Sequence, residues 1–140
     1  MDIRVFEEQD EAAVIALWQD SGLVVAHNDP RRDIARKLQV GGELFLVGVE
    51  KGELVASVMG GYEGHRGWVN YLAVSPAHQR RGYGRLLMQA MECRLLELGC
   101  PKLNLQIRSS NEAVIAFYNS IGYAQDPVVS MGKRLISDEN

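Results

Sequence analysis

The sequence predicts a mixed α/β fold in which most strands are antiparallel and one central pair is parallel. Two turn signals, at Lys51-Gly52 and at residues 64–67 (GHRG), each separate two strand-like segments and therefore predict hairpins. A strand, a helix and another strand then follow one another over residues 68–108, and such a unit requires a parallel pair. Together with the flanking helical segments, these signals predict the element order βααβββαβαβ.

The N-terminal part of the chain predicts one strand and two helices. Residues 2–6 (DIRVF) alternate as a short strand does. Residues 10–21 carry an apolar helical stripe, which consists of Val14, Leu17 and Trp18. In residues 28–38 (NDPRRDIARKL), Asp29 suits the N-cap position and Pro30 the first helical position. The expected buried face of this second helix consists of Ile34 and Leu38.

Three strands are predicted in the middle of the chain. Residues 43–50 (ELFLVGVE) and 53–63 (ELVASVMGGYE) flank the first turn, and residues 68–75 (WVNYLAVS) follow the second. Pro76 ends the third strand, because proline cannot donate to a strand ladder.

The C-terminal half alternates helices and strands. A long helix is predicted from about residue 82 to residue 98, with Gly99 as its stop, followed by a strand over 103–108. A second helix over 111–121 and a last strand over 127–135 complete the order. The apolar stripes of the two helices consist of Leu87, Met91, Leu95 and Leu98, and of Val114, Phe117, Tyr118 and Ile121.

Composition favours one ordinary globular domain over residues 1–140, with 46% hydrophobic and 24% charged residues. The net charge of −3 argues against nucleic acid as a partner. The charged N-terminus contains no long apolar run, so neither a signal peptide nor a membrane anchor is expected, and the cytoplasm is the expected location. The only cysteines, Cys93 and Cys100, form no metal-ligating pattern, so no metal is expected.

The segment HQRRGYGRLLM places Gly82 and Gly84 where the long helix begins. Free N–H groups at a helix N-terminus attract anions, and glycines let phosphate oxygens approach the backbone. The segment lacks both the GxGxxG fingerprint and the GK[ST] of a P-loop. Two interpretations stay open for the segment taken alone, namely a pyrophosphate-binding loop and a plain turn with two convenient glycines.

Two stretches together resemble the GNAT family of N-acetyltransferases. They are YLAVSPAHQRRGYGRLLM (71–88) and NEAVIAFYNSIGY (111–123), and the resemblance extends from residue 2 to about residue 134. The chain is also similar to the small bacterial YpeA-type branch of this family, through MGGYEGHRG (59–67) and GKRLI (132–136). The resemblance implies the acyl-CoA N-acyltransferase fold, whose parallel central strands splay apart, and acetyl-CoA as acetyl donor.

The resemblance also implies roles for individual residues. The backbone of Leu72, Ala73 and Val74 would pair with the pantetheine arm of acetyl-CoA. The pyrophosphate would lie on the loop that consists of Gln79, Arg80, Arg81, Gly82, Tyr83, Gly84 and Arg85. Asn111 would contact the cofactor, and the Tyr118 hydroxyl would lie near the thioester sulfur as the catalytic acid. Tyr118 and Asn111 could equally be a core aromatic and a helix N-cap.

The sequence departs from the family where a base is expected. Relatives that acetylate protein N-termini often read LEVR before the second motif, whereas this chain reads LQIR, so Gln106 holds the place of the glutamate. An amide cannot act as a general base. The substitutes that remain open are Asp29, Glu63, His27, His65 and Tyr71, although a solvated loop, an N-cap and strand packing explain these residues equally well.

The expected activity is acetyl transfer to a primary amine, by direct attack in a ternary complex. The acceptor would be a small molecule or a peptide amine, and Asp29, Glu63 and Gln106 are its candidate contacts. A strongly acidic pocket for a polycationic aminoglycoside is not evident. A non-catalytic acyl-CoA-binding or regulatory module on the same fold is the main alternative, a nucleotide-binding protein is a weaker one, and a homodimer is compatible with the sequence.

Overall fold

The computed structural model of the chain describes residues 1–139. It contains a five-stranded sheet in the order β1-β2-β3-β4-β5. The strands are β1 (Asp2–Val5), β2 (Phe45–Glu50), β3 (Glu53–Tyr62), β4 (Gly67–Val74) and β5 (Leu103–Leu105). The helices are α1 (Glu11–Asp20), α2 (Pro30–Val40), α3 (Tyr83–Glu97) and α4 (Glu112–Ser120), with short 3₁₀ turns at Glu8–Asp10 and Pro76–His78.

The sheet topology agrees with the predicted mixed fold. β1 to β4 pair antiparallel in sequence order, and β4 and β5 form the one parallel pair among the described residues. The connection between the parallel strands contains α3, because parallel neighbours need a crossover and a helix usually supplies it. The predicted mixture of antiparallel strands with one parallel pair is therefore confirmed.

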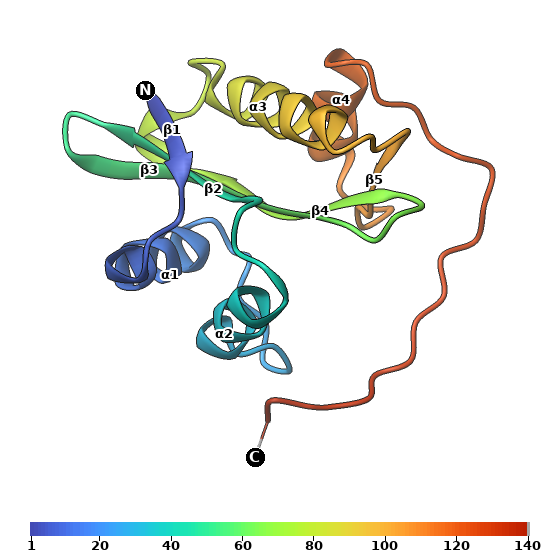
Figure 1. Cartoon of the computed structure of the whole chain (residues 1–140), viewed down its shortest axis with the longest axis horizontal. Helices are drawn as coiled ribbons and strands as arrows, with labels where there is room; N and C mark the ends of the chain where they lie inside the picture. Colours follow the sequence, from blue (N-terminus) through green and yellow to red (C-terminus); the bar gives the residue numbers. More distant parts are fainter. Residues whose placement is uncertain (140) are drawn as a thin grey trace.

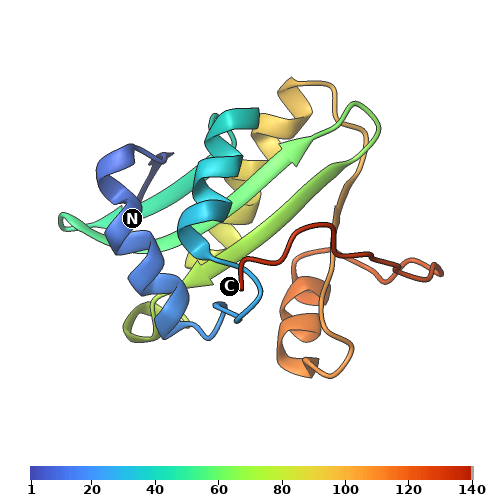
Figure 2. The same cartoon turned by 90° about the horizontal axis from the view of Figure 1, so that it is seen from below.

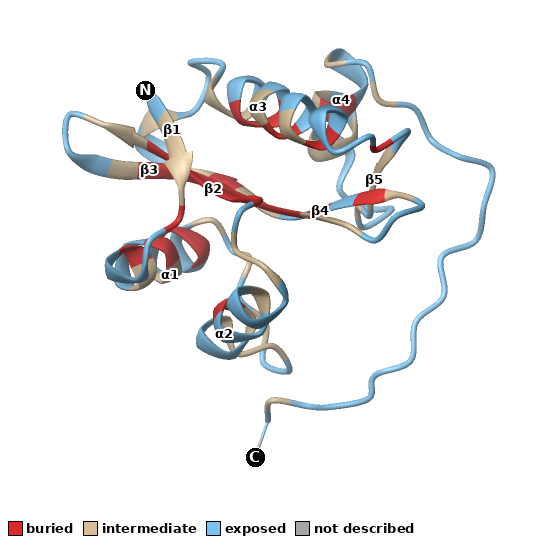
Figure 3. Ribbon diagram, viewed as in Figure 1, coloured by how far each residue is buried: buried red, intermediate tan, exposed pale blue. Residues whose placement is uncertain are grey.

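Helices cover both faces of the sheet, so the core has two halves (Figure 1; Figure 2 gives the view from below). α3 and α4 lie on one face, where Met91 of α3 belongs to one core cluster with Leu46 and Val58 of the sheet. α1 and α2 lie on the other face, where Trp18 and Ile34 pack against Phe45 and Val47. Buried residues accordingly follow the central strands and the inner sides of the helices (Figure 3).

All but two members of the predicted apolar stripes are buried or half-buried, and the three half-buried members, Val114, Phe117 and Ile121, lie on α4 or at its C-terminal end. Val14, Leu17 and Trp18 of α1 are buried, as are Leu87, Met91 and Leu95 of α3. Leu98 is 55% exposed because α3 ends at Glu97, so this residue no longer follows the helical face. Leu38 is 38% exposed, because α2 packs on the core mainly through its N-terminal half, where Ile34 lies.

The predicted strand over residues 127–135 is wrong, and the strand predicted over 103–108 ends at Leu105. Within the described chain, no backbone hydrogen bond joins residues 127–135 to β5. The segment runs extended and away from the sheet (Figure 1), and Val128, Val129 and Met131 are at least 77% exposed. A strand needs a partner that satisfies its backbone groups, and an edge of three residues that then turns away offers little to pair with.

No helix in the described part of the chain combines the length and apolar character needed to cross a membrane.

Candidate active site

The parallel strands β4 and β5 separate after a short stretch of pairing. The pairs are Gly67 with Leu103, Trp68 with Asn104 and Val69 with Leu105, and the ladder ends there. β4 continues to Val74 without β5 beside it. The segment after Leu105 turns away from β4 and leads to α4. The predicted splay of the central pair is therefore confirmed, and it leaves backbone groups of β4 free on the side that β5 has left.

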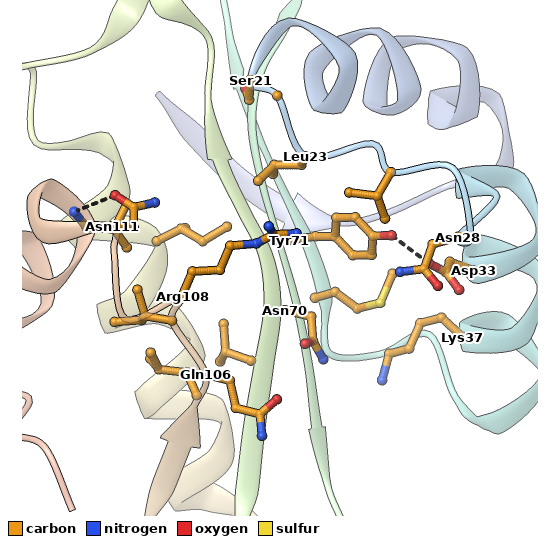
Figure 4. A pocket seen from close by; sticks show the side chains of 18 of the residues that line it. Ser21, Leu23, Asn28, Asp33, Lys37, Asn70, Tyr71, Gln106, Arg108 and Asn111 are labelled. Carbon is orange, nitrogen blue, oxygen red and sulfur yellow. Dashed lines mark hydrogen bonds between the residues drawn. The ribbon is translucent and has the colours of Figure 1, made fainter. Parts of the chain in front are cut away.

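A cavity of about 1030 Å³ opens at this splay (Figure 4). Its walls come from both separated strands, from the loop between α1 and α2, and from the inner sides of α2 and α4. The polar or ionisable side chains on these walls are those of Ser21, His27, Asn28, Asp33, Arg36, Lys37, Asn70, Tyr71, Gln106, Arg108, Asn111 and Tyr118. The cavity is therefore the place where chain segments far apart in sequence bring polar groups together.

A β-bulge in β4 forms part of the cavity wall. Asn70 lies opposite Met59 and Ala73 opposite Ser57, so Tyr71 and Leu72 together face the single residue Val58. Such an extra residue leaves a backbone group without its ladder partner. Tyr71 has a φ of 54°, which is unusual for a residue with a bulky side chain. The bulge therefore points one strained, partly unpaired stretch of backbone at the cavity.

Three contacts hold the bulge in place. The Tyr71 ring stacks on Trp18 with centroids 3.8 Å apart, and its hydroxyl donates to an Asp33 oxygen at 2.5 Å. The buried Ser57 hydroxyl donates to the Tyr71 carbonyl at 3.0 Å and accepts from the Trp18 indole nitrogen at 2.9 Å. Burial, and the bond to Asp33, raise the pKa of the Tyr71 phenol well above its usual value, so Tyr71 stays protonated. Tyr71 is therefore unsuited to act as a base.

Ser57→Ala should lower the free energy of unfolding by about 1–3 kcal/mol, because it leaves a buried indole N–H without an acceptor. Chemical denaturation of the purified variant measures this. Ser120→Ala is the matched control, since the Ser120 hydroxyl bonds the Phe117 carbonyl at the exposed end of α4. It should change stability by less than about 0.5 kcal/mol. Equal effects of the two substitutions would remove Ser57 from the support of the bulge.

Tyr118 is buried in α4 and also lines the cavity. Its ring makes edge-to-face contacts with Phe117 and Tyr123, at centroid distances of 5.0 Å and 5.5 Å. No side chain or carbonyl of residues 1–139 bonds its hydroxyl. Burial raises the pKa of Tyr118 to about 12. The phenol therefore stays protonated at neutral pH, and no group within residues 1–139 accepts a hydrogen bond from it.

The glycine loop lies before α3, at the end of β4, and does not line the cavity. Arg80 and Gly82 both have positive φ angles, of 66° and 78°. No side chain caps the start of α3, and in the part of the chain that the structure describes no acceptor faces the N–H groups of residues 80–85. A β-carbon on Gly82 would meet nothing within 4 Å. The loop thus offers several open N–H groups at the positive end of a helix.

The side chains of this loop have partners within the protein. Glu50, at the end of β2, accepts from Arg81 at 3.4 Å and from the Tyr83 hydroxyl. Gln79 donates to the Val74 carbonyl at 3.3 Å, which ties the loop to β4. A β-carbon on Gly84 would lie 3.1 Å from the Phe117 ring. Close packing of α3 on α4 therefore explains Gly84, whereas the open space at Gly82 faces outward.

The other predicted donor-side residues lie along the same edge. Leu72 lines the cavity, Ala73 is buried, and Val74 is half-buried at the end of β4. Asn111 caps α4 by accepting from the Val114 N–H at 3.3 Å, and it also lines the cavity (Figure 4). The contacts of these residues with a cofactor stay predictions.

The structure separates the candidate acceptor residues. Gln106 lines the cavity and hydrogen-bonds the Ser130 hydroxyl, whereas Glu63 lines a smaller neighbouring cavity of about 260 Å³. Asp29 caps α2 by accepting from the Arg31 N–H at 2.9 Å and does not line the main cavity. His27 lines the main cavity, and the exposed His65 lines neither. Among residues 1–139, no group of three His, Cys, Asp or Glu side chains could hold a metal ion.

Three cations in the main cavity had not been singled out from the sequence. They are Arg36, Lys37 and Arg108, and Asp33 is the only carboxylate among the described lining residues. Arg36 and Lys37 follow Asp33 by three and four positions on a helix, so the three side chains share one face. That spacing was the signal that could have revealed two of them. Arg108 projects across the cavity from the chain after β5 (Figure 4).

Comparison with known proteins gives the class of this fold and cleft. The model of the acetyltransferase (GNAT) family matches residues 6–123. The chain therefore belongs to the GNAT acetyltransferase family, as its two motifs had indicated. The expected enzyme class is confirmed, and it favours the acetyltransferase over the binding module and the nucleotide-binding protein.

Individual relatives support this assignment. An acetyltransferase of Yersinia pestis (strain Pestoides F) is 45% identical over 139 residues, which cover 99% of each chain. The crystal structure of the ribosomal-protein-S18-alanine N-acetyltransferase from Escherichia coli has a TM-score of 0.73 at 26% identity, over 86% of this chain and 76% of that one. A structure of AAC(6')-Iy with a CoA-containing bisubstrate analogue has a TM-score of 0.77 at 17% identity, over 95% and 97%.

Proposed function

We propose that this acetyltransferase transfers an acetyl group from acetyl-CoA to a primary amine, which attacks the thioester directly while both substrates are bound. The observation that carries the proposal is the splay of β4 from β5. It places a bulged backbone and the Tyr118 phenol on one cavity. The open N-terminus of α3 lies beyond the end of β4.

The chain fits the donor in two places. The pyrophosphate carries negative charge, and the N–H groups of residues 80–85 are open at the positive end of α3, with free space at Gly82. The pantetheine arm carries amides, and Leu72 to Val74 offer backbone groups where β5 no longer pairs. Gln79 supports this arrangement indirectly, because it fixes the loop to the end of β4.

Two groups of the chain can assist the transfer. A backbone N–H of the bulge at Tyr71 and Leu72 would stabilise negative charge that develops on the thioester oxygen. The Tyr118 hydroxyl would donate a proton to the sulfur as it leaves. Much of the rate would come from holding the donor and the acceptor in one cavity.

The cavity wall supplies no free carboxylate base. The Asp33 carboxylate already accepts from the Tyr71 hydroxyl and from Arg36. Gln106 is an amide, which has no basic site for an amine proton. We therefore propose that the amine enters in its neutral form or loses its proton to water.

The proposed function is tested by incubating the pure protein with acetyl-CoA and a panel of primary amines while thiol release is followed. We expect release that depends on the amine and that yields its acetyl derivative by mass spectrometry. Binding of CoA without amine-dependent release across small amines and peptides would contradict the proposal and would favour the binding module.

The route of the amine proton has its own test in the pH dependence of kcat/KM. If the amine enters neutral, kcat/KM should rise with pH along the pKa of the acceptor. It should rise equally in wild type, His27→Ala, Glu63→Gln and His65→Ala, of which only His27 lines the main cavity. The measurement runs from about pH 6 to about pH 10 with two acceptors of different basicity. A limb that keeps its position when the acceptor changes, and that disappears in one variant, would identify that residue as the base.

A further inference from the structure

The carboxylate of Asp138 occupies a built site at the start of α2, although the chain around it is exposed. The side chain of Asp138 is only 1% exposed. It accepts from the Asp29 N–H at 2.7 Å, from the two terminal nitrogens of Arg36 at 2.6 Å and 3.2 Å, and from Arg32 at 3.5 Å. A two-pronged bond from one arginine is the geometry by which proteins recognise carboxylates.

The segment that carries Asp138 is otherwise weakly attached. Its contacts with the α1–α2 loop are a bond from the Asp138 N–H to the His27 carbonyl at 3.3 Å and bonds from Arg134 to His27 and Asn28. Leu135 and Ile136 are 86% and 66% exposed, so they bury little apolar surface. The carboxylate is therefore the best-held part of this segment.

The site of Asp138 adjoins the candidate acceptor cavity, because residues that hold the C-terminal segment also line the cavity. Arg36 binds Asp138 and lines the cavity together with Asp33 and Tyr71. His27 and Asn28, which bond the C-terminal segment, also line it. Arg36 thus faces both Asp138 and the space where a ligand in the cavity would lie.

The charges on the cavity wall point to the same ligand chemistry. Arg36, Lys37 and Arg108 are set against the single carboxylate of Asp33. Asp33 is itself neutralised by Arg36 at 3.1 Å and accepts from Tyr71. Arg108 has no ion-pair partner among residues 1–139. A polycationic acceptor would be repelled by such a wall, whereas an acceptor with a carboxylate would be attracted.

We propose that the acceptor carries a carboxylate beside its amine, as an amino acid does, and that this carboxylate takes the place of Asp138 at Arg36. This inference rests on the proposed function, because it names the substrate class of the same cavity. Asp138 then acts as an internal competitor that holds the site closed until a carboxylate-bearing acceptor displaces it. Displacement exchanges one carboxylate for another, so Arg36 never stays unpaired.

Equilibrium binding tests the inference without any catalysis. Phenylalanine with 2-phenylethylamine, and lysine with cadaverine, are pairs that differ in one carboxylate. Each is titrated by calorimetry into wild type, Asp138→Ala, and Asp138→Ala combined with Arg36→Gln. Of phenylalanine and lysine, the amino acid that binds more tightly should bind Asp138→Ala about fivefold more tightly than it binds wild type, because the substitution removes an intramolecular competitor. Adding Arg36→Gln should abolish that gain.

Controls separate recognition from a structural role. Arg31→Gln in the Asp138→Ala background keeps the tighter binding, because the Arg31 side chain makes no contact with Asp138. Thermal melting of each variant shows that it is folded. If Asp138→Ala lowers the melting temperature but changes no carboxylate affinity, or if both members of each pair bind alike, the inference is overturned and Asp138 is a structural clasp.

Failure of this inference differs from failure of the proposed function. Acetylation of amines without any preference for the carboxylate, and with no effect of Arg36→Gln, would retain the acetyltransferase activity and reject the substrate class. Binding of carboxylates through Arg36 without acetylation of any amine would retain the site and reject the proposed reaction.

Discussion

Tyr118→Phe should lower kcat by about ten- to a thousandfold, because the leaving sulfur loses its proton donor. The free energy of unfolding should hardly change. The ring keeps its edge-to-face contacts with Phe117 and Tyr123, and no protein group within residues 1–139 loses a hydrogen bond. Steady-state kinetics with the best acceptor measure kcat and KM, and denaturation measures stability.

Tyr123→Phe is the matched control for this substitution. Tyr123 packs beside Tyr118, but its hydroxyl donates to Glu92 at 2.5 Å and it does not line the cavity. Removal of the Tyr123 hydroxyl should leave kcat within about twofold of wild type, since this hydroxyl contacts no reacting group. A Tyr118→Phe enzyme that turns over at the wild-type rate would show that Tyr118 is only a core residue.

The pH profile gives a second check on Tyr118. Because burial raises its pKa to about 12, the phenol remains protonated throughout the neutral range. An acid of this kind loses activity only as pH rises toward its pKa. Tyr118 should therefore add no falling limb to the kcat profile below about pH 10, and a Tyr118-dependent fall near neutral pH would contradict the environment described for it.

Gly82→Asp should weaken CoA binding by at least about tenfold, which corresponds to about 1.4 kcal/mol. The new carboxylate would lie among the open N–H groups before α3, where it would both fill space and repel the pyrophosphate. The variant should fold, because a β-carbon at this position meets no atom within 4 Å and aspartate tolerates a positive φ. Calorimetric titration with CoA measures the dissociation constant.

Gly82→Asn separates charge from size in this test. Asparagine has nearly the same volume and the same tolerance of the φ of 78°, but it carries no charge. Its affinity for CoA should lie between those of wild type and Gly82→Asp. Unchanged affinity in a folded Gly82→Asp variant would refute the pyrophosphate assignment to this loop.

The sequence by itself determined the type and order of nearly every element in the sheet. The strand segments around Lys51-Gly52 and residues 64–67 predict antiparallel hairpins, because turns this short leave no room for the crossover that a parallel pair needs. The strand–helix–strand unit over residues 68–108 requires a parallel pair for an equally local reason. The motifs that indicated the GNAT family also lie in continuous stretches, so folding was not needed to recognise them.

Only the tertiary structure decided which side chains line the cavity and which residues have a hydrogen-bond or ion-pair partner. The sequence predicted a last strand over residues 127–135, but a strand forms only beside a free edge, and β5 ends after three residues. Sequence alone could not show that a β-carbon on Gly84 would lie 3.1 Å from the Phe117 ring, whereas its contact with the donor stays a prediction. Asp138 and Arg36 are separated by 102 residues in sequence, and no local pattern predicts their ion pair. Contacts of this kind depend on where distant segments meet, and packing of the whole chain determines that.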